Sequence, residues 1–435
     1  QCMVFGFAGS TLTPDTEEMI ARYHVGGFRI AQDRRIVTLL DAVKPGDSPD
    51  EVFLKSLTYP DGLNRDCAFS DPPVSVSAAE YATVLNRMRT IARERKGGIP
   101  LHFAFDQEGN CANALHSGQR VFPDPMGIRA TGDPQSAYRV ARCVGRQARG
   151  VGANMIHSPV IDVNTNPRNP EVAGRGYSDN PEDVIEYALQ SLRGFSETGI
   201  VATAKHFAGR GESETDAHWE LPVVDLPRET LMKDHIAPYR ALIEAGLPAI
   251  MSAHCRYPAL GDPDRPASLS RIVLTDFLRG ELGFDGVITT DNMMMGGILR
   301  QMEMSDAVVE ALIAGNDLIL CRDESPVRKK ILHKVEEAVR EGRLSEKELD
   351  DKVRRILTMR WNMELVENGG LVDTQQAQAV IDDPETVSVT TDIAEKSVMI
   401  LRDRNGIFPL DPQAKILLID QIVHSMTKSN RLTCY

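Results

Sequence analysis

The sequence of 435 residues contains no run of about 18 apolar residues and no low-complexity tract. The first absence excludes a transmembrane helix, and the second argues against a disordered chain. Positive charge is also scarce, because the formal net charge is -13. Binding to nucleic acid phosphates needs a cationic surface. We therefore expect neither a membrane nor a nucleic acid as the partner.

Paired cysteine spacing is absent as well. The seven cysteines form no C-x-x-C motif, which excludes a recognisable zinc ribbon or redox motif, and an odd count does not suit a disulfide framework. Reduced thiols favour a cytoplasmic protein, and we expect a monomer. The chain opens at Gln1, without an initiator Met and already in a predicted strand, so we expect that an upstream piece is missing. Because the N-terminus looks incomplete, secretion is the alternative to a cytoplasmic location.

What the sequence does contain is an alternation of short apolar runs with longer amphipathic stretches, which is typical of βα units. The apolar runs predict eight strands, at residues 3–5, 27–30, 101–105, 153–156, 201–204, 249–252, 286–289 and 317–320. Apolar residues at helical spacing predict helices at residues 78–94, 137–149, 181–198, 271–281, 305–314, 325–342 and 345–360. Together they predict an α/β protein with a (β/α)8 TIM-like barrel. A doubly wound sheet is the alternative, but no glycine-rich dinucleotide turn follows the first strand.

The remaining segments predict the domain organisation. Residues 41–77 are rich in Pro and Asp and weakly periodic, which indicates an inserted rim loop or lid. A shift in composition near residue 365 predicts a catalytic barrel over 1–365, a linker over 366–391 with a polar connector at 367–384, and the incomplete beginning of an α/β sandwich domain over 392–435. In this last part we expect a helix at 392–396 and strands at 398–401, 404–406 and 416–419.

Ionisable or polar residues follow five successive predicted strands. They are Asp106, Gln107 and Glu108, then Asp162 and Asn164, then Lys205 and His206, then His254, and finally Asp291. Barrel enzymes place their chemistry at these strand ends, because the loops there meet at one cavity. A polar residue at the start of a loop explains any one of them, but it explains all five poorly. We therefore expect a polar cavity at this end of the barrel.

Two features near these strand ends suggest acid/base and nucleophilic chemistry. In the loop after the fifth strand, Asp216 stands two residues before His218, close enough to bond the imidazole. A carboxylate there favours the imidazolium, which suits a general acid that must also act as a base near neutral pH. Asp-x-His is also common among solvated loop residues. Asp291 ends an apolar strand, and its spacing fits a helix N-cap as well as a nucleophile.

At this point the segments resemble the β-N-acetylglucosaminidase branch of glycoside hydrolase family 3. The loop Lys-His-Phe at 205–207, Gly-x-Gly at 209–211 and Asp-Ala-His at 216–218 resembles the signature loop of that branch. Further segments resemble the family at 6–9, 25–27, 105–109, 159–164, 174–178, 251–254 and 284–288. Residues 395–410 resemble the opening of the family's second domain. The resemblance therefore covers nearly the whole chain.

The resemblance implies a retaining β-N-acetylglucosaminidase that removes terminal β-linked N-acetylglucosamine from a small oligosaccharide or amino-sugar glycoside. Asp291 would be the nucleophile, His218 the acid/base and Asp216 its orienting partner. The residues expected to contact the sugar are Asp106, Arg175, Lys205 and His206, with Asp162, His254 and Met294 as further candidates. The resemblance implies no metal and no cofactor.

The signature loop departs from the family pattern. Ala208 and Arg210 stand where Pro and His are usual, and Asn110 and Cys111 stand where Gly and Arg are typical. Arg210 has the larger consequence, because a cation near His218 disfavours the imidazolium. A weakened or repurposed enzyme is one reading of these departures, and it keeps a non-catalytic sugar-binding module among the alternatives.

Two further activities stay open. His218 is neutral once it has given up its proton, so an anionic acceptor meets little repulsion, which would suit a phosphorylase. A β-glucosidase of the same family is the other. A metal-dependent barrel hydrolase could use Lys205, His206, His254 and Asp291, but such sites usually add a His-x-His on an early strand. The early histidines, His24 and His102, stand alone.

Overall fold

The computed structural model describes residues 1–8, 12–31, 45–46, 48, 77–109, 114–115, 119–321 and 327–415. Most of the predicted insertion at 41–77 lies outside these ranges. The predicted strand at 416–419 and the two departures Asn110 and Cys111 lie outside them as well.

Eight parallel strands form the centre of the molecule, in the spatial order β10-β1-β2-β3-β4-β5-β6-β9. They are β1 (Met3–Ala8), β2 (Gly27–Ala31), β3 (His102–Phe105), β4 (Met155–Ile156), β5 (Val201–Phe207), β6 (Ala249–Ser252), β9 (Val287–Thr290) and β10 (Ile319–Cys321). A parallel bridge between Thr289 and Leu318 joins the two outer strands of this order. The predicted (β/α)8 barrel is therefore confirmed, with all eight strands in place.

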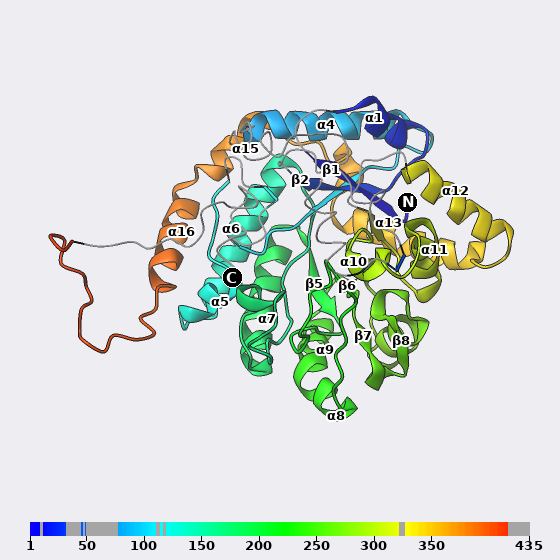
Figure 1. Ribbon diagram of the computed structural model, residues 1–435. Coiled ribbons are helices and arrows are strands. Elements are labelled where there is room, and N and C mark those ends of the chain that lie inside the picture. Colours follow the sequence, from blue (N-terminus) through cyan, green and yellow to red (C-terminus); the bar gives the residue numbers. More distant parts are fainter. Residues whose placement is uncertain are drawn as a thin grey trace.

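Helices cover the outside of the barrel (Figure 1). They are α1 (Pro14–Ala21), α4 (Ala78–Glu94), α5 (Pro125–Ala130), α6 (Gln135–Val151), α7 (Pro181–Glu197), α8 (Arg228–Thr230), η2 (Leu231–Ile236), α9 (Ala237–Glu244), η5 (Ile272–Glu281), α10 (Gly296–Leu299), α11 (Met304–Ala314), α12 (Val327–Arg340) and α13 (Glu346–Asn362). Capping boxes begin α4, with Ser77 and Glu80, and α13, with Ser345 and Glu348. The seven predicted helices are all present, and the one at 271–281 is wound as a π-helix.

Shorter elements lie in the loops. They are the 3-10 turns η1 (Ala173–Arg175), η3 (Pro258–Leu260) and η4 (Ala267–Leu269) and the antiparallel pair β7 (Arg256–Tyr257) and β8 (Asp262–Pro266). Among the helices that the structure describes, none is both long and apolar enough to cross a membrane.

Wherever the burial of a barrel-strand residue is described, it is buried, because helices cover one face of the sheet and the barrel interior fills the other. Strand β5 shows this most clearly, since all seven of its residues are buried. Two of them, Lys205 and His206, are ionisable. Buried ionisable groups need partners, and those partners come from the neighbouring strand ends.

The region after the barrel differs from the prediction. The predicted polar connector at 367–384 contains the end of α14 (Leu365–Asn368) and the whole of α15 (Thr374–Ile381), and α16 (Pro384–Lys396) begins where it ends. Both α15 and α16 lie against α6 (Figure 1), and they bury Ala377, Ile381, Val389 and Ile393. The few apolar residues are spaced for a helix but are outnumbered by polar ones, so composition suggested a connector.

The strands expected at 398–401 and 404–406 are wrong, because the described residues 398–415 contain no strand. Val398 is 76% exposed and Leu401 is 91% exposed, and the segment extends away from the barrel as the red trace of Figure 1. A strand needs a hydrogen-bonded neighbour, and none of the described residues provides one here. The division into domains near residue 365 stays a prediction.

Candidate active site

Residues at the ends of β3 and β5 form a chain of ion pairs. Asp106 follows β3, and its Oδ1 lies 3.1 Å from Lys205 Nζ. Its Oδ2 accepts hydrogen bonds from Arg29 Nε at 2.9 Å and Nη2 at 2.7 Å. Glu108 pairs with the same Lys205 and accepts from Arg175 Nε at 2.6 Å. Two predicted residues, Asp106 and Lys205, are thus in direct contact, and Arg175 joins them through Glu108.

These pairs keep the carboxylates ionised although they are buried. Burial opposes ionisation of Asp106, but Lys205 and Arg29 outweigh it and hold its pKa well below the usual range. Burial likewise opposes ionisation of Glu108, but Arg175 and Lys205 lower its pKa to about 2. The array therefore offers fixed charges near neutral pH, a preorganised arrangement that suits binding of sugar hydroxyls.

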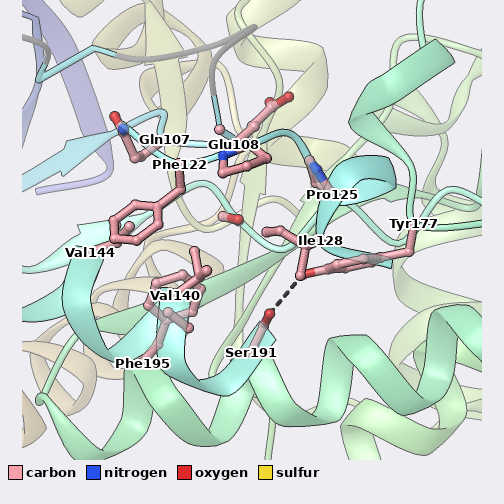
Figure 2. A pocket seen from close by; sticks show the side chains of 14 residues that line it. Gln107, Glu108, Phe122, Pro125, Ile128, Val140, Val144, Tyr177, Ser191 and Phe195 are labelled. Atoms are coloured by element: carbon pink, nitrogen blue, oxygen red, sulfur yellow. Dashed lines mark hydrogen bonds between the residues drawn. The ribbon is translucent and has the colours of Figure 1, made fainter. Parts of the chain in front are cut away.

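The loop after β3 rests on a small cavity between α6 and α7 (Figure 2). Its lining is mostly apolar and includes Phe122, Val140 and Phe195, while the hydroxyl of Tyr177 lies 2.7 Å from Ser191 Oγ. The volume of about 30 Å³ is enough for one or two water molecules and too small for a sugar. The cavity therefore lies behind Glu108 and is not the substrate site.

His206 is held as a neutral base between an acid and a cation. Its Nδ1 lies 2.7 Å from Asp162 Oδ2, and its Nε2 lies 2.8 Å from Arg210 Nη2. A guanidinium only donates, so Nε2 accepts and the ring proton sits on Nδ1. Burial and then Arg210 lower the pKa of His206 well below its usual value. The structure thus brings the predicted residues Asp162 and His206 together, with Arg210 as their neighbour.

Asp291 directly follows β9 and points into this network. Its Oδ2 lies 3.6 Å from Arg210 Nη1 and 3.9 Å from His206 Nε2, and its backbone N–H donates to Ser252 O at 3.1 Å. Burial opposes ionisation, but Arg210, His254 and Lys205 lower the pKa of Asp291. Helix α10, the next helix, has Met295 as its N-cap. Asp291 is therefore an ionised carboxylate at the end of β9 and does not cap that helix.

The Asp-x-His pair forms as expected. Asp216 Oδ1 lies 2.7 Å from His218 Nδ1, and it also accepts the backbone N–H of His218 at 2.8 Å. Partial removal of the ring from water disfavours its charged form, but Asp216 and its hydrogen bond outweigh this and raise the pKa of His218. The side chain of His218 is 49% exposed. With Nδ1 held by Asp216, the second ring nitrogen is left for proton exchange.

Backbone hydrogen bonds tie this dyad to the segment after Asp291. The N–H of Gly296 donates to His218 O at 2.9 Å, and the N–H of Gly297 donates to Ala217 O at 3.0 Å. A Cβ at Gly296 would lie only 2.6 Å from His218 O, so this close approach requires glycine. The loop that carries His218 and the turn that carries Asp291 are thus one hydrogen-bonded unit.

His254 and Met294 have contacts within the protein. His254 Nδ1 lies 2.7 Å from Ser268 Oγ, and its Nε2 lies 3.0 Å from Asn292 O. Both ring nitrogens are therefore occupied, and His254 holds the residue after Asp291 in place. Met294 is half-buried and packs against the core. Contact of either residue with sugar stays a prediction.

The prediction missed Arg29, which pairs with Asp106, and Glu171, which lies beside the dyad. Arg29 is a lone cation inside the apolar run of β2, and that was the available signal. Glu171 lies in the loop between β4 and α7, away from any strand end, so the strand-end rule could not find it. Its Oε1 lies 3.4 Å from His218 Nδ1.

Among the described residues, one group has the spacing to hold a metal ion. It consists of Glu171, Asp216 and His218, whose candidate ligand atoms lie within 4.8 Å of one another. The hydrogen bond of Asp216 with His218 accounts for this spacing without a metal.

Comparison with known proteins identifies the family of the chain. The model of the glycosyl hydrolase family 3 N terminal domain matches residues 74–359, well over half of the chain. The chain belongs to glycosyl hydrolase family 3. Beta-hexosaminidase A of Pseudoalteromonas piscicida is 26% identical over 431 residues, which are 94% of this chain and 64% of that protein. A beta-N-acetylglucosaminidase/beta-glucosidase of Cellulomonas fimi is 27% identical over 348 residues, covering 77% of this chain and 59% of that protein.

Solved structures give the same family. A family 3 beta-N-acetylglucosaminidase from Paenibacillus sp. str. FPU-7 aligns with a TM-score of 0.74 at 30% identity, covering 91% of this chain and 67% of that one. The beta-glucoside phosphorylase BglX aligns with a TM-score of 0.72 at 29% identity, covering 78% of this chain and 61% of that one. The chain spans 59–64% of the length of the two curated relatives named above.

Proposed function

We propose that this family 3 chain is a retaining β-N-acetylglucosaminidase in which Asp291 is the nucleophile and His218 the acid/base. The observation that carries the proposal is the dyad. An imidazole with a raised pKa is held at 2.7 Å by Asp216, on a loop bonded to the turn that presents the ionised Asp291. A retaining mechanism needs such a proton donor and such a carboxylate at one cavity.

In the first step of the proposed mechanism, Asp291 attacks the anomeric carbon while protonated His218 gives its Nε2 proton to the leaving oxygen. Cleavage of the glycosidic bond leaves a covalent glycosyl-enzyme and a neutral imidazole. In the second step, His218 takes a proton from the attacking water, and the bond to Asp291 breaks. Asp216 keeps the ring oriented and stabilises its charged form in both steps.

The solvent exposure of Asp106 and Glu108 indicates a different role for each carboxylate in this proposal. The side chain of Asp106 is 21% exposed, whereas that of Glu108 is 2% exposed. Asp106 can therefore accept a hydrogen bond from a sugar hydroxyl, while Glu108 keeps Lys205 and Arg175 in position. His206 Nε2 is already paired with Arg210, so His206 would orient this cation beside the sugar.

The test is to trap the covalent intermediate. A 5-fluoro-N-acetylglucosaminyl fluoride should label the protein once, and peptide mass spectrometry should place the sugar on Asp291. Asp291→Asn should take up no label. Labelling of another residue would contradict the assigned nucleophile. Parallel assays with aryl β-N-acetylglucosaminide and aryl β-glucoside give the sugar preference, and insensitivity to a chelator argues against the metal-dependent alternative. Binding of sugar with no turnover or label would favour the binding module.

Phosphate as the acceptor is a second candidate. It is motivated by the use of an imidazole where many glycosidases use a carboxylic acid, because neutral His218 does not repel an anion. Phosphorus NMR of reactions run with inorganic phosphate should then show a sugar 1-phosphate. Unchanged rates and products on adding phosphate would remove this candidate.

A further inference from the structure

A buried chain of alternating charges connects the proposed nucleophile to the proposed acid/base. Arg210 is 1% exposed, and its Nη1 lies 3.6 Å from Asp291 Oδ2. Its Nη2 lies 2.7 Å from Glu171 Oε1, and the same Oε1 lies 3.4 Å from His218 Nδ1. The order of charges is therefore carboxylate, guanidinium, carboxylate and imidazole.

Arg210 acts in opposite directions on the two ends of this chain. A nearby cation favours the ionised form of Asp291, which a nucleophile needs. The same cation disfavours the protonated form of His218, which a general acid needs. Asp216 offsets this effect at Nδ1 of the ring. Glu171 adds to the offset at the same nitrogen, and it also lies against the guanidinium of Arg210.

The position of Glu171 is fixed by the backbone. Its Oε2 accepts the N–H of Ala217 at 3.2 Å, and its own N–H donates to Asn169 Oδ1 at 2.9 Å. Asn169 Nδ2 in turn donates to Arg210 O at 2.8 Å. The loop after β4 and the signature loop are thus joined around the carboxylate. The side chain of Glu171 is only 3% exposed, so water screens its charge weakly. This burial raises the pKa of Glu171, while the neighbouring Arg210, His218 and Arg175 favour the ionised carboxylate.

Resting on the proposed function, we propose that Glu171 is a positioning residue that neutralises Arg210 and adds a second carboxylate to His218. The Arg210–Glu171 pair then keeps the nucleophile Asp291 as a carboxylate and the acid/base His218 as an imidazolium. Arg210 stabilises the carboxylate of Asp291. Glu171 offsets the charge of Arg210 at His218, so the imidazole keeps its proton.

The charged groups that act on His218 are Asp216, Glu171 and Arg210. Glu171 faces these groups and Arg175, whose Nη1 lies 3.9 Å from it.

On the other side, Asp291 faces Arg210, His254 and Lys205, with His206 Nε2 at 3.9 Å. Loss of the negative charge at Glu171 should therefore make His218 harder to protonate, while Asp291 keeps its cationic neighbours.

The first experiment measures kcat/KM against pH for the wild type and Glu171→Gln. The substrates are a β-linked N-acetylglucosamine disaccharide, whose leaving group needs a proton, and a dinitrophenyl glycoside, whose leaving group does not. With the disaccharide, the basic limb of Glu171→Gln should move to lower pH, giving a loss of about tenfold near pH 8 and less than about twofold near pH 5. With the dinitrophenyl glycoside the two proteins should differ little.

The matched control is Glu214→Gln, which removes a carboxylate from the loop after β5 that carries the dyad. Glu214 is exposed and pairs with Arg168, away from the dyad, so its pH profile should equal that of the wild type.

A double variant separates charge from structure. In Glu171→Gln/Arg210→Gln both members of the buried pair lose their charge together, while Asp291 keeps His254 and Lys205 as cationic neighbours. The basic limb should return toward the wild-type position, because one positive and one negative neighbour of His218 are lost together. The acidic limb should move to higher pH, because Asp291 loses Arg210. An equal loss at every pH with both substrates would instead assign Glu171 a structural role only and overturn the proposal.

A measurement without turnover keeps the inference separate from the proposed function. Nitrogen NMR of 15N-histidine protein, with His218→Gln to assign the signal, follows protonation of His218 directly. The midpoint should fall in Glu171→Gln and recover in the double variant. An unchanged midpoint would overturn the role of Glu171 even in an active enzyme, whereas a shifted midpoint in an inactive protein would contradict only the proposed activity.

Discussion

At the scale of single residues, the site contains two kinds of charged group. Asp106 and Glu108 are ionised throughout the neutral range, because buried cations hold the pKa of each far below its usual value. His218 is different, since the pKa of this ring is raised from an ordinary value that already lies near neutrality. The first group can position a substrate, and the second can exchange a proton during the reaction.

In Asp216→Asn the basic limb of the pH–rate profile should move to lower pH, so the enzyme is active over a narrower pH range. The carboxylate of Asp216 raises the pKa of His218, so without it the ring loses its proton at lower pH and stops acting as an acid there. Near pH 8 we expect a loss of about 10²–10³-fold in kcat/KM on a substrate with a poor leaving group. The measurement is a pH–rate profile, and an unmoved basic limb would contradict the assignment of the dyad.

Glu108→Gln should change how stability depends on pH. Burial opposes ionisation of Glu108, but Arg175 and Lys205 lower its pKa from 4.5 to about 2. A depressed carboxylate contributes stability that is present above about pH 4.5 and is lost as pH falls toward 2, amounting to about 3 kcal/mol. Urea unfolding of the variant should show a lower free energy near pH 7 and a weaker dependence on pH in that window. Equal slopes in both proteins would contradict the pairing.

At the scale of elements, the catalytic geometry depends on how one loop meets one helix. The dyad loop bonds to the first turn of α10 through the N–H groups of Gly296 and Gly297. Asp291 begins the turn that leads into this helix. The distance between the proposed acid/base and the nucleophile is thus set by a backbone contact that admits no side chain.

Gly296→Ala should disturb this contact while the fold persists. Its new Cβ would lie 2.6 Å from His218 O and 2.7 Å from Trp219 O, so the loop must shift. A displacement of about 1 Å at a catalytic group can cost about a hundredfold in rate, and we expect a loss of that order in kcat/KM.

The control is Gly280→Ala, whose Cβ would meet only Thr275 O, at 3.6 Å. It should keep the wild-type rate, and equal rates for both variants would contradict the tight contact.

The elements themselves were largely predictable from the sequence. Strands buried on both faces read as continuous apolar runs, and polar residues at their ends located Asp106, Lys205, His206 and Asp291. The dyad was found by its spacing.

Contacts made across loops were not predictable in this way. Glu171 lies far from any strand end and meets His218 only through the folded loops. Helix α15 was missed because it is short and half of its residues are polar, so it depends on its packing against α4 and α6.

At the scale of the whole molecule, α16 attaches residues 384–396 to the barrel helices α5 and α6. Arg139 of α6 lies 2.6 Å from Asp392, and Arg146 lies 2.5 Å from Asp383 and 2.9 Å from Glu385. These pairs are partly exposed, so each contributes little, about 0–1 kcal/mol. Burial of apolar side chains must supply most of the attachment, and Ile393 is fully buried there.

Ile393→Ala should therefore destabilise the barrel as a whole. Removing three buried carbons from a packed position costs about 3 kcal/mol, and α16 contacts α5 and α6 of the barrel. Urea unfolding followed by circular dichroism should show one transition moved to lower urea. Leu401→Ala is the control, because Leu401 is 91% exposed and its removal should leave the midpoint unchanged. If the two variants unfold alike, or if Ile393→Ala melts only a minor first phase, α16 behaves as an independent connector and the contacts with α6 do not carry stability.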